Sequence, residues 1–158
     1  MQIFRRHVTL MPVEWTKDVL PWAPPALTVL GWYLVNKQSN AREVRKEMRS
    51  ASDRCKALAR ESVLLGMQYW AGAEGVEAWQ VKVVLDELDI ELCRFPERQG
   101  RMELLEKHAD LLDAITGDDF ESSTPKARSS EDPVMRKMSK ARQRLLVEIE
   151  HQFEKHYC

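Results

Sequence analysis

Residues 19–36 read Val-Leu-Pro-Trp-Ala-Pro-Pro-Ala-Leu-Thr-Val-Leu-Gly-Trp-Tyr-Leu-Val-Asn, the longest stretch of the chain without a charged side chain. A helix of these 18 residues would rise about 27 Å, close to the thickness of about 30 Å of a bilayer's hydrocarbon core. The sequence therefore predicts a single transmembrane anchor at residues 19–36, preceded by a short N-terminal segment at residues 1–18.

Aromatic side chains flank the predicted anchor, with Trp15 before it and Trp32 and Tyr33 near its end. Such amphipathic rings favour the headgroup zones of a bilayer, and a glycine such as Gly31 lets a second helix approach closely. The residues expected to form the anchor are Trp15, Pro24, Pro25, Leu27, Leu30, Gly31, Trp32 and Tyr33.

Three prolines argue against a straight helix through the whole stretch. Pro21, Pro24 and Pro25 lack backbone donors, so a regular helix is expected to begin at about Pro24, where the first turn tolerates proline. Two other interpretations of residues 19–36 stay open. The segment could be buried in a soluble core or lie in the membrane interface, or it could belong to a cleaved signal peptide with small residues at 39–41.

Basic residues predict the orientation of the anchor. Three precede it and five follow it closely, and Lys and Arg are retained on the cytoplasmic side. The C-terminal body, residues 37–158, is therefore expected in the cytoplasm of a bacterium, attached to the inner membrane. The expected juxtamembrane basic residues are Lys37, Arg42, Arg45, Lys46 and Arg49, against Arg5, Arg6 and Lys17 on the other side.

The 158-residue chain has a net charge of only −1, but the charge is unevenly distributed. Residues 37–61 carry eight bases and four acids, net +4, and residues 72–121 carry five bases and fourteen acids, net −9. Residues 126–158 carry eight bases and five acids, net +3. Basic, acidic and basic helices in succession favour pairing within one bundle. Three dispersed cysteines do not form a disulfide framework and fit a reducing compartment.

The first helix after the anchor is expected over residues 40–70. Its small and apolar residues alternate at spacings of four and three, the period that keeps one seam against a partner helix. The seam residues expected to make helix–helix contacts are Val44, Met48, Ala51, Cys55, Leu58, Leu65 and Tyr69.

Three more helices are expected, over residues 76–95, 98–116 and 133–156, with a flexible polar loop at 118–132. The second has its apolar side at Ala78, Val81, Leu85, Leu88, Leu92 and Phe95, widened by Trp79 and Val84. The third has Met102, Leu105, Ala109, Leu112 and Ile115, and the last has Met135, Met138, Leu145 and Ile149. No strand pattern occurs, so the predicted fold is all-α: an N-terminal transmembrane helix followed by an antiparallel bundle of about four helices.

No motif in the sequence predicts catalysis. Glu148 and His151 match the Glu-x-x-His spacing of di-iron bundles, but that chemistry needs a second such pair, which the sequence lacks. A Ser-His-Asp arrangement, a phosphate-binding glycine loop and a Cys-x-x-Cys pair are also absent from the sequence. No enzyme activity, cofactor or metal is therefore expected.

Residues 30–49, Leu-Gly-Trp-Tyr-Leu-Val-Asn-Lys-Gln-Ser-Asn-Ala-Arg-Glu-Val-Arg-Lys-Glu-Met-Arg, resemble a pattern found in small bacterial single-pass membrane proteins. In that group an N-terminal hydrophobic segment passes into a basic juxtamembrane helix and a cytoplasmic helical domain. Gly-Asp-Asp-Phe-Glu-Ser at 117–122 is similar as well. Some of these proteins are similar to products encoded beside mobile elements or phage-defence genes. The resemblance implies a topology and assigns no functional residue.

The expected function is that of a membrane-anchored helical protein that binds or scaffolds a partner protein, with self-association into a homo-oligomer consistent with its small residues. Its expected partners are the lipid bilayer and a protein of unknown identity. Two alternatives remain open. One is a membrane-perturbing effector of a bacterial defence or toxin-like system. The other is a soluble bundle that contacts nucleic acid through the basic faces of its helices, a contact that the acidic residues 72–121 disfavour.

Overall fold

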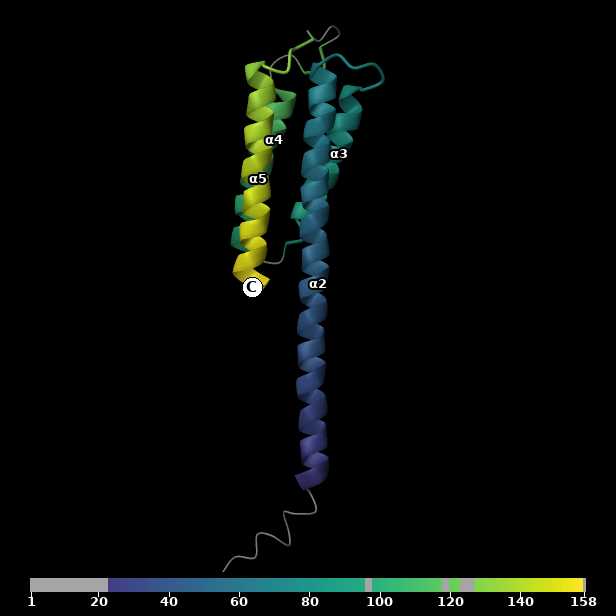
Figure 1. The fold of residues 1–158 in the computed structure, drawn as a ribbon, viewed down its shortest axis with the longest axis vertical. Coiled ribbons are helices and arrows are strands. Elements are labelled where there is room, and N and C mark those ends of the chain that lie inside the picture. Colours follow the sequence, from purple (N-terminus) through teal and green to yellow (C-terminus); the bar gives the residue numbers. More distant parts are fainter. Residues whose placement is uncertain (1–22, 96–97, 118–119, 123–126, 158) are drawn as a thin grey trace, which may run out of the picture. The chain divides into compact units, whose positions relative to one another are not determined.

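The computed structural model describes residues 23–95, 98–117, 120–122 and 127–157, and every regular element within these ranges is a helix (Figure 1). The helices are α2 (Ala23–Trp70), α3 (Ala78–Leu92), α4 (Arg98–Thr116) and α5 (Pro133–Tyr157). The chain divides into two compact units, Met1–Glu43 and Val44–Cys158, and α2 runs through both. The expectation of an all-α helical bundle is confirmed.

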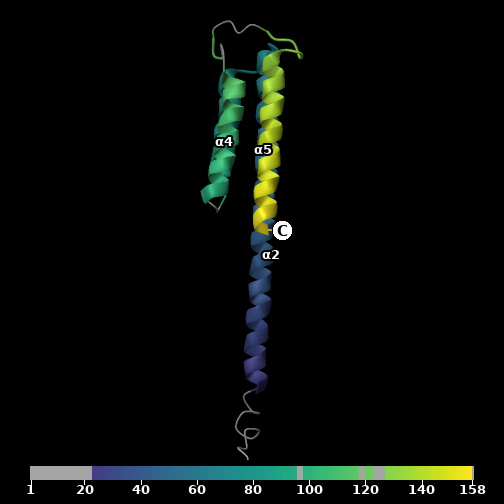
Figure 2. The ribbon, with the colours of Figure 1, turned by 90° about the vertical axis from the view of Figure 1, so that its left-hand side faces the viewer.

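The bundle lies in the unit Val44–Cys158, where successive helices run in opposite directions (Figure 1). Figure 2 shows α4 alongside α5, and α3 packs on α4. Leucine and isoleucine side chains from α3, α4 and α5 fill the core. Its fully buried members include Leu85, Leu88, Leu92, Leu104, Leu111, Ile115, Leu145 and Ile149.

The helix expected over residues 40–70 ends at Trp70, as expected, but begins earlier, at Ala23. Pro24 and Pro25 occupy its first turn, where an N–H group has no intrahelical acceptor to lose. At the other end Gly72 has a φ of 74° and its N–H donates to Tyr69 O at 3.0 Å, while Ala73 N–H donates to Gln68 O at 3.0 Å. This pair of bonds is a Schellman cap, which requires the left-handed backbone that glycine adopts without strain.

The predicted seam of α2 faces the bundle core over most of its length. Cys55, Leu58 and Tyr69 are buried, and Met48, Ala51 and Leu65 are half-buried. Val44, at the beginning of the unit, is exposed. The seam therefore serves the packing of its own bundle.

The apolar side predicted for α4 is correct at Ile115, which is buried, and at Leu105, which is half-buried against the core, but wrong at Met102, Ala109 and Leu112, which are exposed. The buried face consists of Leu104, His108, Leu111, Ala114 and Ile115. The buried positions follow the expected three-four spacing, but one of them is a histidine, which a search for apolar residues passes over. Trp79 of α3, expected to widen the core stripe, is also exposed.

The start of α5 agrees with the cap expected from the sequence. Val134 N–H donates to the Asp132 carboxylate at 2.9 Å, and Pro133 occupies the first helical position.

The loop before α5, expected to be flexible, is attached to the bundle by aromatic and cationic contacts in its described parts. The Phe120 ring lies 4.8 Å from the Tyr69 ring, and Glu121 N–H donates to the Tyr69 hydroxyl at 3.1 Å. Arg128 N–H donates to Trp70 O at 2.7 Å, and its guanidinium lies 4.6 Å above the Trp70 ring.

The described residues contain no helix that is both long enough and apolar enough to cross a bilayer. The transmembrane helix predicted at residues 19–36 is therefore not supported. α2 has 48 residues, but two prolines open its uncharged part and Lys37 ends it. Residues 19–22 and Trp15 lie outside the described residues.

Replacing Trp70 with Phe tests the contact that joins α2, α4 and the loop. Trp70 is buried and its Nε1–H donates to Ile115 O at 2.9 Å. Trp70→Phe leaves that carbonyl without its donor and removes buried volume, so we expect a loss of about 2–3 kcal/mol in the free energy of unfolding. Trp79→Phe, at an exposed tryptophan of α3, should change it by less than about 0.5 kcal/mol. Urea unfolding of the full chain, followed by circular dichroism, measures both.

The buried His108 predicts a pH dependence of stability near neutrality. Burial lowers the pKa of His108 from 6.5, against a smaller opposing effect of Asp89, whose carboxylate lies 3.4 Å from Nδ1. The unfolded chain then binds more protons than the folded chain just below pH 6.5, so stability falls as pH falls through this window.

We expect a lower urea midpoint at about pH 5.5 than at about pH 7.5, and a smaller difference in His108→Gln. His151→Gln, at an exposed histidine of α5, is the matched control and should keep the wild-type difference. An unchanged pH dependence in His108→Gln would show that another group is responsible.

Candidate functional site

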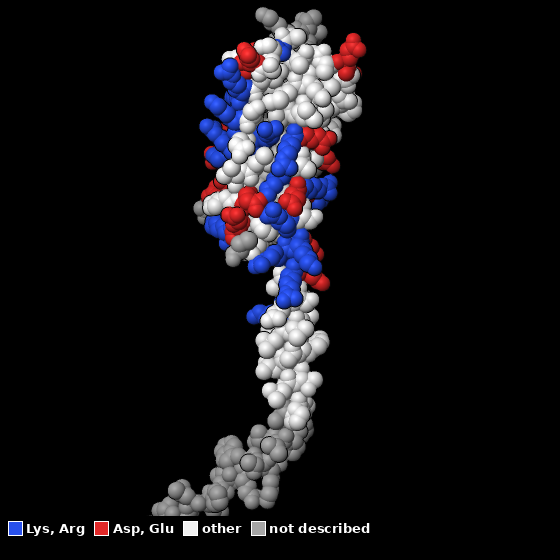
Figure 3. Space-filling model, in the orientation of Figure 1, with Lys and Arg blue, Asp and Glu red and all other residues white. Residues whose placement is uncertain are grey.

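The uncharged part of α2 exposes apolar side chains around its whole circumference. Successive residues of an α-helix are rotated by about 100°, so a run of consecutive apolar residues leaves no polar side. Seven large side chains between residues 27 and 35 are each 50–68% exposed: Leu27, Val29, Leu30, Trp32, Tyr33, Leu34 and Val35. Figure 3 shows this segment as an uncharged surface that ends where basic side chains begin. An apolar surface of this kind is stabilised only when contact with another apolar environment removes it from water.

The five basic residues predicted to flank the anchor fall into two groups. Lys37, Arg42, Arg45 and Lys46 are exposed and form no ion pair with the residues that the structure describes. Arg49 differs, because its guanidinium lies 2.7 Å from Glu150 and 3.5 Å from Asp53, and 4.9 Å above the Phe153 ring. Arg49 therefore contributes to packing of α2 on α5.

Glu150 is the centre of the polar cluster that receives Arg49. Lys56 Nζ also bonds to Glu150, and these two cations hold the pKa of the Glu150 carboxyl below its usual range. The charged groups of this cluster pair with one another, so the cluster offers no free group for a ligand.

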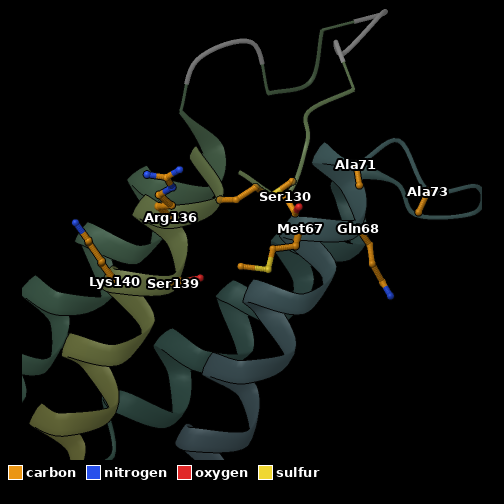
Figure 4. Close-up of a pocket in the computed structure, with 9 residues that line it drawn as sticks. Met67, Gln68, Ala71, Ala73, Ser130, Arg136, Ser139 and Lys140 are labelled. Atoms are coloured by element: carbon orange, nitrogen blue, oxygen red, sulfur yellow. The ribbon is translucent and has the colours of Figure 1, made fainter. Parts of the chain in front are cut away.

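A groove opens between the C-terminal end of α2 and the first turns of α5 (Figure 4). Its volume is about 540 Å³, within the range of about 300–1,000 Å³ typical of pockets that hold organic ligands. Met67, Ala71 and Met135 give it a mostly apolar lining, and Arg136 and Lys140 place two cations on its α5 side. The remaining lining residues are Gln68, Ala73, Ser130 and Ser139.

Basic side chains also line the exposed side of α5, along the left edge of Figure 3. Arg136, Lys140 and Arg144 recur every four residues, so they lie on one face of the helix, and all three are exposed. Lys137, next to this face, pairs with Asp113 at 2.7 Å. Within the described residues, the three cations of the face have no ion-pair partner.

The buried polar groups of the bundle are structural. Glu91 is buried and accepts hydrogen bonds from Arg94 at 3.0 Å, and the Arg54 guanidinium lies 3.2 Å away. Gln152 Nε2 donates to Glu103 and Glu148 at 2.6 Å each. Each of these carboxylates has a partner inside the protein, and none of them lines the groove between α2 and α5.

The Glu-x-x-His pair of the sequence does not become a metal site in the described residues. His151 Nδ1 lies 3.5 Å from Glu148, but no group of three His, Cys, Asp or Glu side chains with the geometry to hold a metal occurs there. Cys55 is buried, and burial, with a smaller effect of Glu91, raises the pKa of its thiol to about 12, which removes its reactivity as a nucleophile. Cys93 is exposed.

Sequence reasoning missed the groove, because its lining comes from two helices and a turn that are far apart in the chain. The spacing of Met135, Arg136 and Lys140 on α5 was visible, but only the fold brings them beside Met67 and Ala71.

No protein-family model, no curated protein and no solved structure matches this chain.

Proposed function

We propose that the chain is a membrane-attached helical protein without catalytic activity, in which the uncharged part of α2 is the membrane-contacting element and the unit Val44–Cys158 is a binding module for a partner protein. The observation that supports attachment most directly is the exposure of apolar side chains around the full circumference of α2 between residues 27 and 35. A helix that contacted only one neighbouring surface would need apolar side chains on one side only, and not around its full circumference.

The free energy available from lipid contact is large compared with other effects at this segment. Burying one large apolar side chain contributes about 1.5–3 kcal/mol, so the seven together would contribute on the order of 10 kcal/mol. The four cations at residues 37–46, which have no ion-pair partner in the part of the chain that the structure describes, would add about 1 kcal/mol each beside an anionic leaflet.

A single span is the arrangement that we favour for this attachment. The uncharged sequence extends back from Ala23 to Val19, and the basic residues after it outnumber those before it. This asymmetry supports a cytoplasmic location for the unit Val44–Cys158 at a bacterial inner membrane. Helical bundles with exposed grooves commonly bind proteins, which supports the second half of the proposal.

Fractionation of the full-length protein with a lysine substitution tests the attachment. We expect wild-type protein to stay in the membrane pellet after an alkaline-carbonate wash. Leu30→Lys places a charge in the middle of the apolar segment, at a cost of about 2.5–3.5 kcal/mol if the segment spans the bilayer, and should move at least half of the protein to the supernatant.

Leu64→Lys is the matched control, because Leu64 is an equally exposed leucine of α2 outside the uncharged segment. It should remain in the pellet like wild type. Protease added to each side of sealed vesicles then reports which side carries the bundle. Release of wild-type protein by carbonate as an intact, folded species would refute membrane attachment through this segment.

A further inference from the structure

α3 carries a second helix–helix seam that the bundle does not use. Trp79, Val83, Asp86, Ile90 and Cys93 recur at spacings of four, three, four and three, the heptad rhythm, and all five are exposed. At about 100° per residue their side chains fall on a stripe less than about 90° wide. We call these five residues the outer stripe of α3.

The outer stripe is additional to the side of α3 that the fold requires. Val81, Leu85, Leu88 and Leu92 are buried on the opposite side and complete the core. Three large apolar side chains, Trp79, Val83 and Ile90, are each more than half exposed along the outer stripe. Exposed apolar side chains that recur with a helical period are typical of a docking face.

The charge at the centre of the outer stripe restricts what can pair with it. Asp86 lies midway between Trp79 and Cys93, so two outer stripes packed antiparallel about a twofold axis would place their Asp86 carboxylates close together. Like charges at the centre of a helix pair are unfavourable. The stripe therefore needs a partner surface that is apolar and carries a cation.

The groove between α2 and α5 has this composition. Met67, Ala71 and Met135 supply apolar lining, while Arg136 and Lys140 supply two exposed cations without an ion-pair partner among the described residues. α3 and α5 appear on opposite sides of α2 in Figure 1, so one copy can present its outer stripe and its groove to two different neighbours.

We propose that the outer stripe of α3 in one copy of this chain docks into the α2–α5 groove of a second copy, with Asp86 facing Lys140. The inference rests on the proposed role of the unit Val44–Cys158 as a binding module and names its partner, but it does not depend on membrane attachment. The contact joins two different surfaces, so each added copy leaves one stripe and one groove free. Such an interface extends into a row of copies unless it closes into a ring.

Crosslinking of the full-length chain in the cells that produce it tests the interface. Cys93 is an exposed member of the outer stripe, and Ser139→Cys places a thiol in the groove beside Lys140. Cys158→Ser removes the third cysteine of the sequence, and Cys55 is buried with a thiol pKa raised to about 12, so it does not compete. The probe is a homobifunctional maleimide with a spacer of about 10 Å, the helical rise between Asp86 and Cys93.

We expect a ladder of dimers, trimers and longer products that requires both Cys93 and Ser139→Cys. Asp86→Lys or Lys140→Glu should each reduce the ladder at least about fivefold, because each brings like charges together. The double variant Asp86→Lys/Lys140→Glu, or co-production of the two single variants, should restore it to within about twofold, because opposite charges then meet again at every contact.

Glu154→Lys, a charge reversal at an exposed position of α5 about 21 Å from Lys140 along the helix, is the matched control and should leave the ladder unchanged. Circular dichroism of each purified variant checks that the helices remain folded. Two outcomes would overturn the proposal: a ladder that is absent from the doubly reactive chain, or a ladder that charge reversal reduces and the reciprocal change fails to restore.

A dimer that forms through Cys93 alone would also overturn the proposal, since it would indicate that two outer stripes pair with each other and not with the groove. Products are scored separately in the membrane pellet and the supernatant, and again in Leu30→Lys. With Leu30 unchanged, a ladder found in the supernatant would refute attachment while leaving the interface intact. In Leu30→Lys a supernatant ladder is the result expected if both proposals hold, so the two proposals fail independently.

Discussion

The hydrogen bond from Trp70 to the Ile115 carbonyl is the contact on which the arrangement of one end of the bundle depends. It joins the last turn of α2 to the last turn of α4 at 2.9 Å, inside the core. The ring of Trp70 then receives the Arg128 guanidinium, and its own carbonyl accepts the Arg128 N–H. The side chain and the backbone carbonyl of Trp70 thus fix two helix ends and the approach to α5. The groove beside α2 exists because Met67 and Ala71 flank this fixed point while Gly72 ends the helix directly afterwards.

Close approach of the helices depends on two glycines elsewhere in the core. A Cβ atom on Gly66 would lie 3.1 Å from Ile115 Cγ2 and 3.3 Å from Met138 Sδ, so α4 and α5 occupy the space that a side chain on α2 would need. A Cβ atom on Gly100 would overlap the Gln152 carboxamide, which two carboxylates hold in place. Small residues set the spacing of the bundle at both positions, in agreement with the dense packing of protein interiors.

The sequence predicts the fold well where apolar periodicity is unambiguous and fails where a polar residue takes a core position. The core sides of α3 and α5 follow the predicted residues, with Val81, Leu85 and Leu88 buried on one helix and Met138 and Ile149 on the other. On α4 the prediction shifts, because the buried His108 interrupts the apolar pattern and exposed Met102 and Leu112 imitate it. Which side of a helix faces the core depends on which residues are buried, and tertiary contacts determine which residues are buried.

The candidate sites also differ in how far they can be predicted from the sequence. An uncharged segment is evident from its sequence, since a helix exposing apolar groups on every side needs no neighbour to be recognised. The groove and the outer stripe of α3 are not evident from the sequence, because both depend on which surfaces the bundle leaves exposed. Trp79, for example, is predicted to widen the core but is exposed in the structure.

An apolar stripe that stays exposed carries a risk of unselective association, and the position of Asp86 bears on that risk. A polar residue within an apolar helix seam lowers the stability of a pairing and raises its selectivity, because the group needs a suitable partner when it is desolvated. Here the carboxylate disfavours symmetric self-pairing and any purely apolar surface, and it favours a surface with an unpaired cation beside an apolar groove. Lys140 lies at such a groove in the same chain. Placing the acid and the base on different faces of one bundle makes recognition directional, which a symmetric apolar contact of the same area does not.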